Sequence, residues 1–288
     1  MQGKVLALMT ALCFGLNPVI LKYGFARKGR SDVAVVIGLL IAVPIYLLWA
    51  PFVGGISLAH LSLQAWIGFI FGGIFGGAIG RRWLYLAVQR LGASPAAAIK
   101  NSAPMITTAL ALVVLGEHVT SLQWLAIVEI VVGITLVSWS GGTPGGRWSQ
   151  FLNVGMLAAI GAAISYGIRP LFLKWGLDQA NVPMTAALIG ALAAAALAIA
   201  LTPQRELWTG MWAPSTGAFA ISGVLQSLGF LALTFGLSSA NVSVVYPVTS
   251  AAPLFTLLFT AILLRKTERI RWPTVVGACV IVVGVIQL

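Results

Sequence analysis

Residues 14–24 of this chain read FGLNPVILKYG, and residues 166–176 read YGIRPLFLKWG. Five of the eleven positions are identical in the two stretches, including a proline in each. A second pair, AIKNSAPMIT at 98–107 and PVTSAAPLFT at 247–256, follows at nearly the same offset. Apolar helices that resemble each other through composition alone would not keep one order and one offset. The two pairs therefore predict a chain built from two related halves.

Long apolar runs surround these stretches. Of the 288 residues, 59% are hydrophobic and 8% are charged, whereas a soluble globular protein carries about 25% charged residues. A membrane-spanning helix needs about 20 apolar residues, so ten runs nearly exhaust the chain and leave no sizeable soluble domain. The predicted spans are Gly3–Leu21, Val33–Val53, Ala65–Val88, Pro95–Leu115, Leu122–Trp139, Asn153–Leu173, Met184–Leu201, Ala213–Phe235, Val242–Leu264 and Trp272–Leu288.

We predict an all-α membrane protein of ten transmembrane helices, formed by two five-helix repeats at residues 1–145 and 146–288. An odd number of spans in each half inverts the second half relative to the first. Inverted repeats are typical of alternating-access carriers, whose binding site lies near the middle of the membrane between the halves. The sequence therefore predicts a central cavity bordered by both repeats.

The basic residues predict the orientation of these helices. The net charge of +11 does not indicate nucleic-acid binding, because the basic residues stand singly or in short clusters between apolar runs. The odd-numbered connections hold nearly all of those outside the spans, and the opposite side holds Lys4 and Lys174. The positive-inside rule places the odd connections in the cytoplasm. We expect a multi-pass protein of a bacterial inner membrane with both termini in the periplasm.

The order of these features resembles one known family. Two five-helix repeats, a proline in the first helix of each, and a proline-bearing fourth helix followed by a glutamate turn are similar to EamA-type exporters of the drug/metabolite transporter superfamily. The resemblance covers essentially the whole chain, and 247–256 is most similar to aromatic amino acid exporters. It implies a basket of ten helices that exports small metabolites or drugs. The first span lacks the glutamate with which small multidrug members exchange protons for cations.

Charged residues inside the predicted spans are candidates for function, because burying a charge in a bilayer is costly. Glu129 is the acid nearest the middle of a span. It fits proton coupling, a contact with a substrate ammonium, or a fixed ion pair with a neighbouring helix. Arg81, Arg82 and Lys100 lie toward the cytoplasmic ends of their spans. They fit either a basic entrance that attracts carboxylates or side chains that extend to lipid phosphates.

Polar pairs near the repeated prolines are the candidate substrate site. Lys100 and Asn101 occupy the place in the first half that Thr249 and Ser250 occupy in the second. If the repeats align, the two pairs face one central space from opposite halves. We predict that Lys100 and Asn101 contact a substrate carboxylate through charge-assisted hydrogen bonds.

Prolines inside two spans are candidate hinges. Asn17 precedes Pro18, and Arg169 precedes Pro170 at the equivalent place. Proline removes a backbone hydrogen bond, and a membrane tolerates this where the break lines a cavity or meets a neighbour. We interpret Pro18 and Pro170 as hinges rather than simple kinks, and Asn17 as a substrate-binding residue.

Aromatic side chains within the spans complete the predicted site. They suit apolar or aromatic substrates and can hold an ammonium group by cation–π contact. Ordinary helix packing is the alternative for each of them. The candidates are Trp83, Tyr85, Tyr166 and Tyr246.

These features favour an exporter of small metabolites, chiefly neutral or aromatic amino acids. One alternative is an efflux carrier for drugs or lipophilic cations, which the scarcity of buried acids disfavours. Another is a carrier of sugar nucleotides or phosphate esters, which a basic entrance favours. We expect no enzymatic activity, cofactor or metal, because the chain has no catalytic triad, phosphate loop or metal-ligand cluster. The expected partners are a small-molecule substrate and the lipid bilayer, with the monomer as the functional unit.

Overall fold

The computed structural model of this protein describes residues 2–59, 61–103, 105–107, 110, 121–140, 153–239, 248–249, 251–264 and 271–287, and this part of the chain is helical. Six of its helical segments are long and apolar enough to cross a membrane. They are Val5–Ala26, Ser31–Phe52, Leu63–Leu91, Val154–Gln179, Pro183–Leu201 and Thr216–Gly236. The prediction of an all-α, multi-pass membrane protein is confirmed.

The long helices coincide with predicted spans. In the first half they are α1 (Gln2–Ala26), α2 (Ser31–Trp49), and a third crossing made of α3 (Leu63–Gly73), the π-helix η2 (Ile74–Ile79) and α4 (Gly80–Leu91). In the second half they are α8 (Val154–Gln179), α9 (Pro183–Leu201) and α11 (Thr216–Ser239), with the short α10 (Gln204–Met211) before α11.

Other helices overlap the remaining predicted runs. They are α5 (Ala93–Lys100), α7 (Ser121–Ser140), α13 (Ala252–Leu263) and α14 (Trp272–Gln287). Their apolar parts are shorter than a full crossing over the described residues. The count of ten crossings therefore stays a prediction.

Two helices extend past their predicted ends. The expected span that closes at Leu21 continues as α1 to Ala26, and the one that closes at Leu173 continues as α8 to Gln179. Lys174 thus lies inside α8, where it pairs with Asp178 one turn later. Hydropathy marks only the part of a helix that lies in hydrocarbon, whereas backbone hydrogen bonds continue where water solvates the charged side chains.

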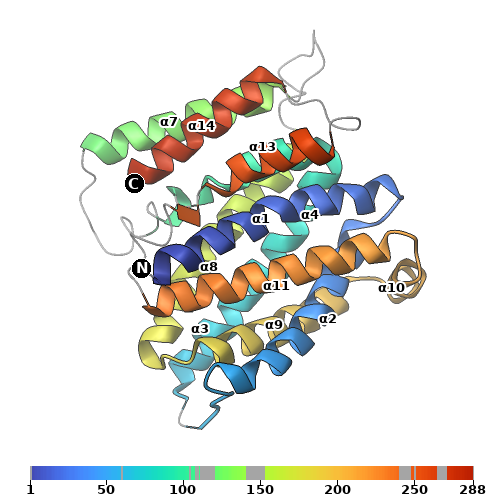
Figure 1. The fold of residues 1–288 in the computed structure, drawn as a ribbon, viewed down its shortest axis with the longest axis vertical. Coiled ribbons are helices and arrows are strands. Elements are labelled where there is room, and N and C mark those ends of the chain that lie inside the picture. Colours follow the sequence, from blue (N-terminus) through green and yellow to red (C-terminus); the bar gives the residue numbers. More distant parts are fainter. Residues whose placement is uncertain are drawn as a thin grey trace.

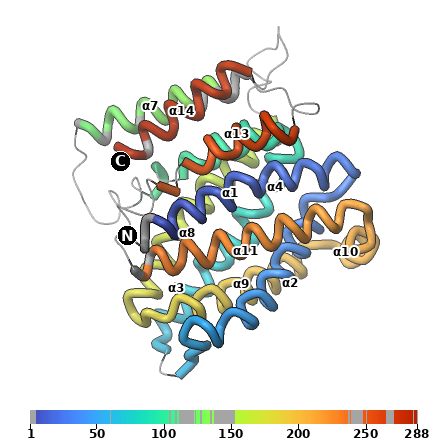
Figure 2. Tube along the Cα trace, in the orientation of Figure 1, coloured from blue at the N-terminus to red at the C-terminus, as the bar shows by residue number. Residues whose placement is uncertain are grey.

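The helices run roughly alongside one another, so the bundle has two ends (Figure 1). The labelled chain termini lie at one end, and α10 lies at the other. Helix α1 packs along α11, α8 along α3 and α4, and α2 and α3 both pack against α9. Helices α7 and α14 pack along each other at the edge of the bundle, as the tube in Figure 2 also shows.

Glycines allow two of these crossings to bring backbone against backbone. A Cβ atom on Gly223 of α11 would lie 2.8 Å from the Cα of Gly38 on α2. A Cβ atom on Gly73 of α3 would overlap the backbone of Gly190 on α9. Small residues permit close helix contact in membranes, where the hydrophobic effect does not drive helices together.

A second kind of close contact, between a glycine and a threonine, joins each proline-bearing helix to a neighbouring segment. Thr256 of α13 donates from Oγ1 to the carbonyl oxygen of Gly15 on α1, at 3.0 Å. Thr107 donates in the same way to the carbonyl oxygen of Gly167 on α8, at 2.7 Å. A Cβ atom on either glycine would lie less than 3.0 Å from a backbone oxygen of the partner segment. The same glycine–threonine contact therefore occurs twice.

The outer surface of the bundle carries large apolar side chains. Leu48, Leu63 and Trp212 are among the most exposed of them. A soluble monomer rarely exposes contiguous apolar patches of more than a few hundred square ångströms, so this surface suits lipid tails.

Candidate functional site

A narrow cavity, which we call the central cavity, lies inside the bundle between α1, α4, α5, α8, α11 and α13. Its free volume is about 20 Å³, enough for about one water molecule, so it is closed to a metabolite in this conformation. The lining residues are Phe14, Asn17, Pro18, Leu84, Ala97, Lys100, Asn101, Tyr166, Gln226, Ala252, Pro253 and Thr256. The fold thus brings together four predicted site residues, Asn17, Lys100, Asn101 and Tyr166.

Lys100 ends α5 and reaches the central cavity between two aromatic rings. Its Nζ lies 4.9 Å from the centre of the Tyr166 ring and 5.7 Å from that of Phe14. Gly92, with a φ of 104°, separates α4 from α5 and turns the chain so that α5 enters the bundle. Among the described residues, Lys100 forms neither an ion pair nor a hydrogen bond.

Asn17 joins α1 to α11 beside the cavity. Its side-chain amide donates to the carbonyl oxygen of Ser222 at 2.9 Å and to the Ser222 Oγ at 3.0 Å. Its Oδ1 is buried and has no hydrogen-bond partner in the described part of the chain. Pro18 follows directly and lines the cavity, whereas Pro170 lies inside α8 and does not.

Gln226 and Phe14 line the cavity but were not predicted. Gln226 is almost fully buried on α11. A polar residue within an apolar run is a signal that sequence analysis could have used for Gln226. Phe14 carries no such signal, because an apolar side chain in an apolar run does not reveal which way it points.

Two predicted aromatic residues lie outside the cavity lining. Tyr85 is fully buried, and its hydroxyl lies 3.5 Å from the Ser222 Oγ. Trp83 is 41% exposed, and its ring packs next to Gly161 on α8. Thr249 is described but does not line the cavity. Tyr246 and Ser250 lie outside the described residues.

Glu129 lies away from the cavity. It is on α7, where the side chain of Gln287 on α14 donates to its Oε2 at 3.0 Å. This contact is a hydrogen bond between neighbouring helices rather than the ion pair considered from the sequence. A role for Glu129 in proton coupling stays a prediction.

A larger hollow of about 480 Å³, which we call the vestibule, lies on another face of α4 beside the start of α2. Three arginines and one carboxylate give its lining a positive balance. The lining residues are Arg30, Ser31, Asp32, Arg82, Trp83, Leu86, Gln89 and Arg90. Arg82 therefore belongs to the vestibule, whereas the adjacent Arg81 is buried inside the bundle and does not extend to lipid.

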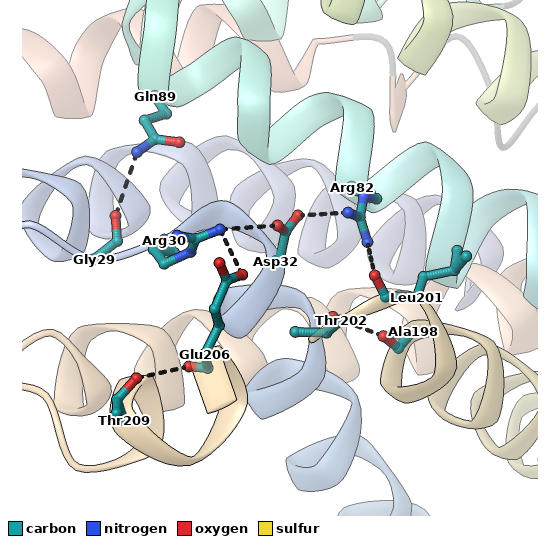
Figure 3. Close-up of polar contacts among 10 residues, drawn as sticks. All are labelled: Gly29, Arg30, Asp32, Arg82, Gln89, Ala198, Leu201, Thr202, Glu206 and Thr209. Atoms are coloured by element: carbon teal, nitrogen blue, oxygen red, sulfur yellow. Dashed lines mark hydrogen bonds and ion pairs between the residues drawn. The ribbon is translucent and has the colours of Figure 1, made fainter. Parts of the chain in front are cut away.

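An ion-pair network closes one side of the vestibule (Figure 3). Asp32 lies 3.2 Å from Arg82 and 3.8 Å from Arg30, and Arg30 also lies 2.6 Å from Glu206 on α10. Arg82 donates to the carbonyl oxygen of Leu201, at the end of α9. The network therefore connects α2, α4, α9 and α10 at the end of the bundle opposite the chain termini (Figure 1).

The described residues contain no group of three or more His, Cys, Asp or Glu side chains that could hold a metal ion. Comparison with solved structures finds a similar fold in a chain described only as "Crystal structure of protein". The two share 16% sequence identity, the match covers 99% of this chain and 95% of that one, and the TM-score is 0.66. No curated protein has a sequence that matches this chain.

The comparison with family models covers nearly all of the sequence. The model of the EamA-like transporter family matches residues 1–139 and 153–288. This match agrees with apolar crossing helices, an internal cavity and a lipid-facing outer surface. The chain therefore belongs to the EamA-like transporter family, whose members are membrane transporters of small molecules rather than enzymes.

Proposed function

We propose that this transporter exports small metabolites that carry a carboxylate, first among them neutral and aromatic amino acids, by alternating access. The observation that carries the proposal is Lys100, a cation at a closed internal cavity with no ion pair or hydrogen bond to a described residue. An unpaired charge in such a place costs several kcal/mol. A substrate carboxylate would offset this cost through a charge-assisted hydrogen bond.

The rest of the lining suits the body of such a substrate. Phe14, Tyr166 and Leu84 offer apolar surface, while Asn17 and Gln226 offer amide groups. The ammonium group of an amino acid can donate a hydrogen bond to the Oδ1 of Asn17, which has no partner among the described residues. It can also contact the aromatic rings by cation–π interaction. The resemblance of 247–256 to the aromatic amino acid exporter YddG also supports amino acids as the first candidates.

Duplicated contacts support alternating access between two inverted repeats. The Gly15–Thr256 contact corresponds to the Gly167–Thr107 contact, at the offset found in the sequence. The Gly38–Gly223 crossing corresponds in the same way to the crossing of Gly190 and Gly73. The family model matches residues 1–139 and 153–288 as two segments, near the proposed boundary between repeats. In this proposal the closed cavity is an occluded state, and Pro18 and Pro170 are hinges.

The ion-pair network supports the proposed orientation. Its arginines, and the connection at 27–30, lie at the end of the bundle opposite both chain termini. The positive-inside rule would place this end in the cytoplasm of a bacterial cell and the termini in the periplasm. Reporter fusions after residue 288 and within 27–30 test this orientation, and a periplasmic signal from 27–30 would contradict it.

The three arginines of the vestibule favour one second candidate, a carrier of sugar nucleotides or other phosphate esters. Guanidinium groups bind phosphate in bidentate geometry, so such an entrance suits these substrates. An efflux carrier for lipophilic cations fits less well, because Lys100 would repel a cation from the central cavity.

Flux into proteoliposomes tests the proposed function. The panel contains amino acids, a sugar nucleotide and a quaternary amine, each with wild-type protein and with Lys100→Met. We expect carboxylate flux in the wild type and a loss of roughly ten- to a hundredfold in Lys100→Met, because a charge-assisted contact contributes about 1.5–3 kcal/mol. Flux of the quaternary amine alone, or unchanged carboxylate flux in Lys100→Met, would contradict the proposal. Size-exclusion profiles of both proteins check that the variant folds.

A further inference from the structure

Arg81 is a buried cation inside the third crossing. It lies seven residues before Val88, where the predicted span ends, which is about 10 Å along the helix axis. The hydrocarbon layer of a bilayer is about 30 Å thick, so this position lies within it, toward the end that holds the vestibule. Arg81 is only 4% exposed. A charge at this depth is expensive unless a partner neutralises it, so the identity of that partner matters.

The surroundings of Arg81 supply donors but not enough acceptors. Its Nε and Nη1 have no hydrogen-bond partner among the described residues. The nearby Tyr166 hydroxyl is also buried and finds no acceptor there. A guanidinium group only donates hydrogen bonds, whereas the phenol oxygen of Tyr166 can accept one from Arg81 and its hydroxyl still has one to donate. Several buried donors in one place therefore lack an acceptor.

The described acidic side chains do not fill this gap, because each is bonded elsewhere. Asp32 and Glu206 pair with the arginines of the vestibule, and Asp178 pairs with Lys174. Glu129 accepts a hydrogen bond from Gln287. Within the described structure, the missing partner of Arg81 is thus not a carboxylate of the chain.

Tyr166 connects Arg81 to the central cavity. The face of its ring lies 4.9 Å from the Nζ of Lys100, which lines the cavity. Arg81 and Arg169 both act electrostatically on the Tyr166 hydroxyl, and Arg169 repels Lys100. Three cations therefore gather around one tyrosine, with Lys100 at its ring and Arg81 near its hydroxyl.

The backbone next to these cations is irregular and rich in glycine. The π-helix η2 ends at Ile79, just before Arg81, and such irregular turns frequently occur at functional sites. Gly76 within η2 admits the side chain of Arg169, which a Cβ atom there would overlap. Gly38 faces the Nη1 of Arg81, and a Cβ atom there would lie 3.4 Å away. Glycine backbone and the hydroxyl groups of Tyr85 and Tyr166 thus border the guanidinium group, and none of the described carboxylates does.

We propose that the substrate carries two acidic groups, of which Lys100 binds one, while Arg81 and the Tyr166 hydroxyl bind the other. This inference rests on the proposed function and narrows its substrate class, metabolites that carry a carboxylate, to those with a second acidic group: dicarboxylates and acidic amino acids take the place of neutral amino acids as the first candidates. A dianion supplies one negative charge for each of the two cations. A monocarboxylate on Lys100 leaves Arg81 without a partner.

The test compares glutamate with glutamine, which have nearly the same shape but differ by one acidic group. Binding to the purified full-length protein is measured for the wild type, Arg81→Gln, Arg81→Lys and Arg82→Gln. Arg82 is the matched control, because it is adjacent in sequence but points to Asp32 and Leu201 in the vestibule (Figure 3). Succinate and its monoamide form a second pair without an ammonium group.

We expect the wild type to prefer glutamate and succinate over their amides. Arg81→Gln should weaken binding of the dianions by roughly ten- to a hundredfold and leave the amides unchanged, because one charge-assisted contact is lost. Arg81→Lys keeps the positive charge and should retain part of the preference for dianions over their amides. Arg82→Gln should change both members of each pair by the same factor.

Thermal unfolding separates binding from a structural role. Since no described acid pairs with Arg81, Arg81→Gln should not lower the melting temperature of the ligand-free protein. It should abolish the rise in melting temperature that a dianion causes in the wild type. A ligand-free protein that melts at a lower temperature in Arg81→Gln would indicate a structural role and overturn the proposal.

The outcomes distinguish this inference from the proposed function. If glutamine binds through Lys100 as tightly as glutamate, the inference fails and carboxylate transport stands. If neither member of either pair binds, the inference fails, and the proposed function fails with it only if the proteoliposomes also show no flux of any amino acid. If Arg81→Gln does not fold, two measurements remain: whether the wild type binds each dianion more tightly than its amide, and whether Arg81→Lys keeps part of that difference. A wild type that binds both members of each pair equally would overturn the inference.

Discussion

Helices α1 and α8 share a local pattern but differ in chemistry at one position. Each carries an internal proline, and in each a glycine carbonyl oxygen accepts a hydrogen bond from a threonine hydroxyl. The residue before the proline is Asn17 in α1 and Arg169 in α8. Asn17 donates to Ser222, whereas the guanidinium carbon of Arg169 lies 3.8 Å from the centre of the Phe230 ring.

This difference separates the scaffold from the site. The contact between a glycine carbonyl and a threonine hydroxyl occurs twice, at Gly15 with Thr256 and at Gly167 with Thr107. The side chains at the centre of the bundle are not duplicated: Lys100 lies at the ring of Tyr166, and Arg81 and Arg169 act electrostatically on its hydroxyl. We infer that symmetric positions govern folding and asymmetric positions govern substrate choice.

The largest expected effect comes from disrupting the glycine–threonine contact, either at Gly15 or at Gly167. Gly15→Val and Gly167→Val each place a branched side chain against a backbone oxygen, at 2.9 Å and 2.8 Å for the Cβ atom alone. Overpacking of this kind costs about 1–3 kcal/mol, and more where backbone must move. We expect similar losses of monodisperse protein and of melting temperature in both variants.

Gly217→Val is the control, because nothing lies within 4 Å of a Cβ atom at Gly217. If one of the two scaffold variants were as stable as the wild type, the two contacts would not be equivalent.

The second prediction sharpens the comparison by testing motion. Pro18→Ala and Pro170→Ala each restore a backbone donor within α1 or α8. A hydrogen bond contributes about 1 kcal/mol, so stiffening a hinge should slow transport about fivefold in each variant. The proteins should be at least as stable as the wild type, because proline disfavours a helix interior. Flux and thermal unfolding measured together check this, and normal flux in the double variant would reduce both prolines to passive kinks.

The smallest expected effect comes from removing the ion pairs at one end of the bundle. At one end Asp32 connects two arginines across separate segments, whereas at the other Lys174 and Asp178 pair within α8. Partly exposed ion pairs contribute about 0.2–1 kcal/mol, so Asp32→Asn should change the transport rate by up to about fivefold. High salt should reduce the difference between variant and wild type. Asp178→Asn is the control and should behave as the wild type; an equal effect of both variants would remove any special role of the network.

Much of the fold could be predicted, because its signals are local. An apolar run of about 20 residues indicates a crossing whatever surrounds it, and the two proline-bearing stretches indicate duplication by their offset. Asn17, Lys100, Asn101 and Tyr166 were singled out because a polar or aromatic residue near a repeated proline is conspicuous in an apolar run, and all four line the central cavity; their role in binding stays a prediction.

The direction of side chains on α4 could not be predicted in this way. The π-helix η2 inserts a wider turn before Gly80, which rotates the residues that follow around the helix axis. Trp83 consequently lines the vestibule and packs next to Gly161, and Arg81 faces the interior. A regular helix of about 3.6 residues per turn, which sequence analysis assumes, does not predict this rotation. Gln226 was missed for another reason, since it belongs to a helix without a proline motif.

The size of the central cavity has a consequence for the cell that holds this protein. A space of about 20 Å³ accepts about one water molecule, so it cannot contain a file of waters linked by hydrogen bonds. Protons cross membranes readily along such files. In the closed conformation, therefore, the central cavity offers protons no such path between the described helices, and we expect the closed carrier not to dissipate a proton gradient through it.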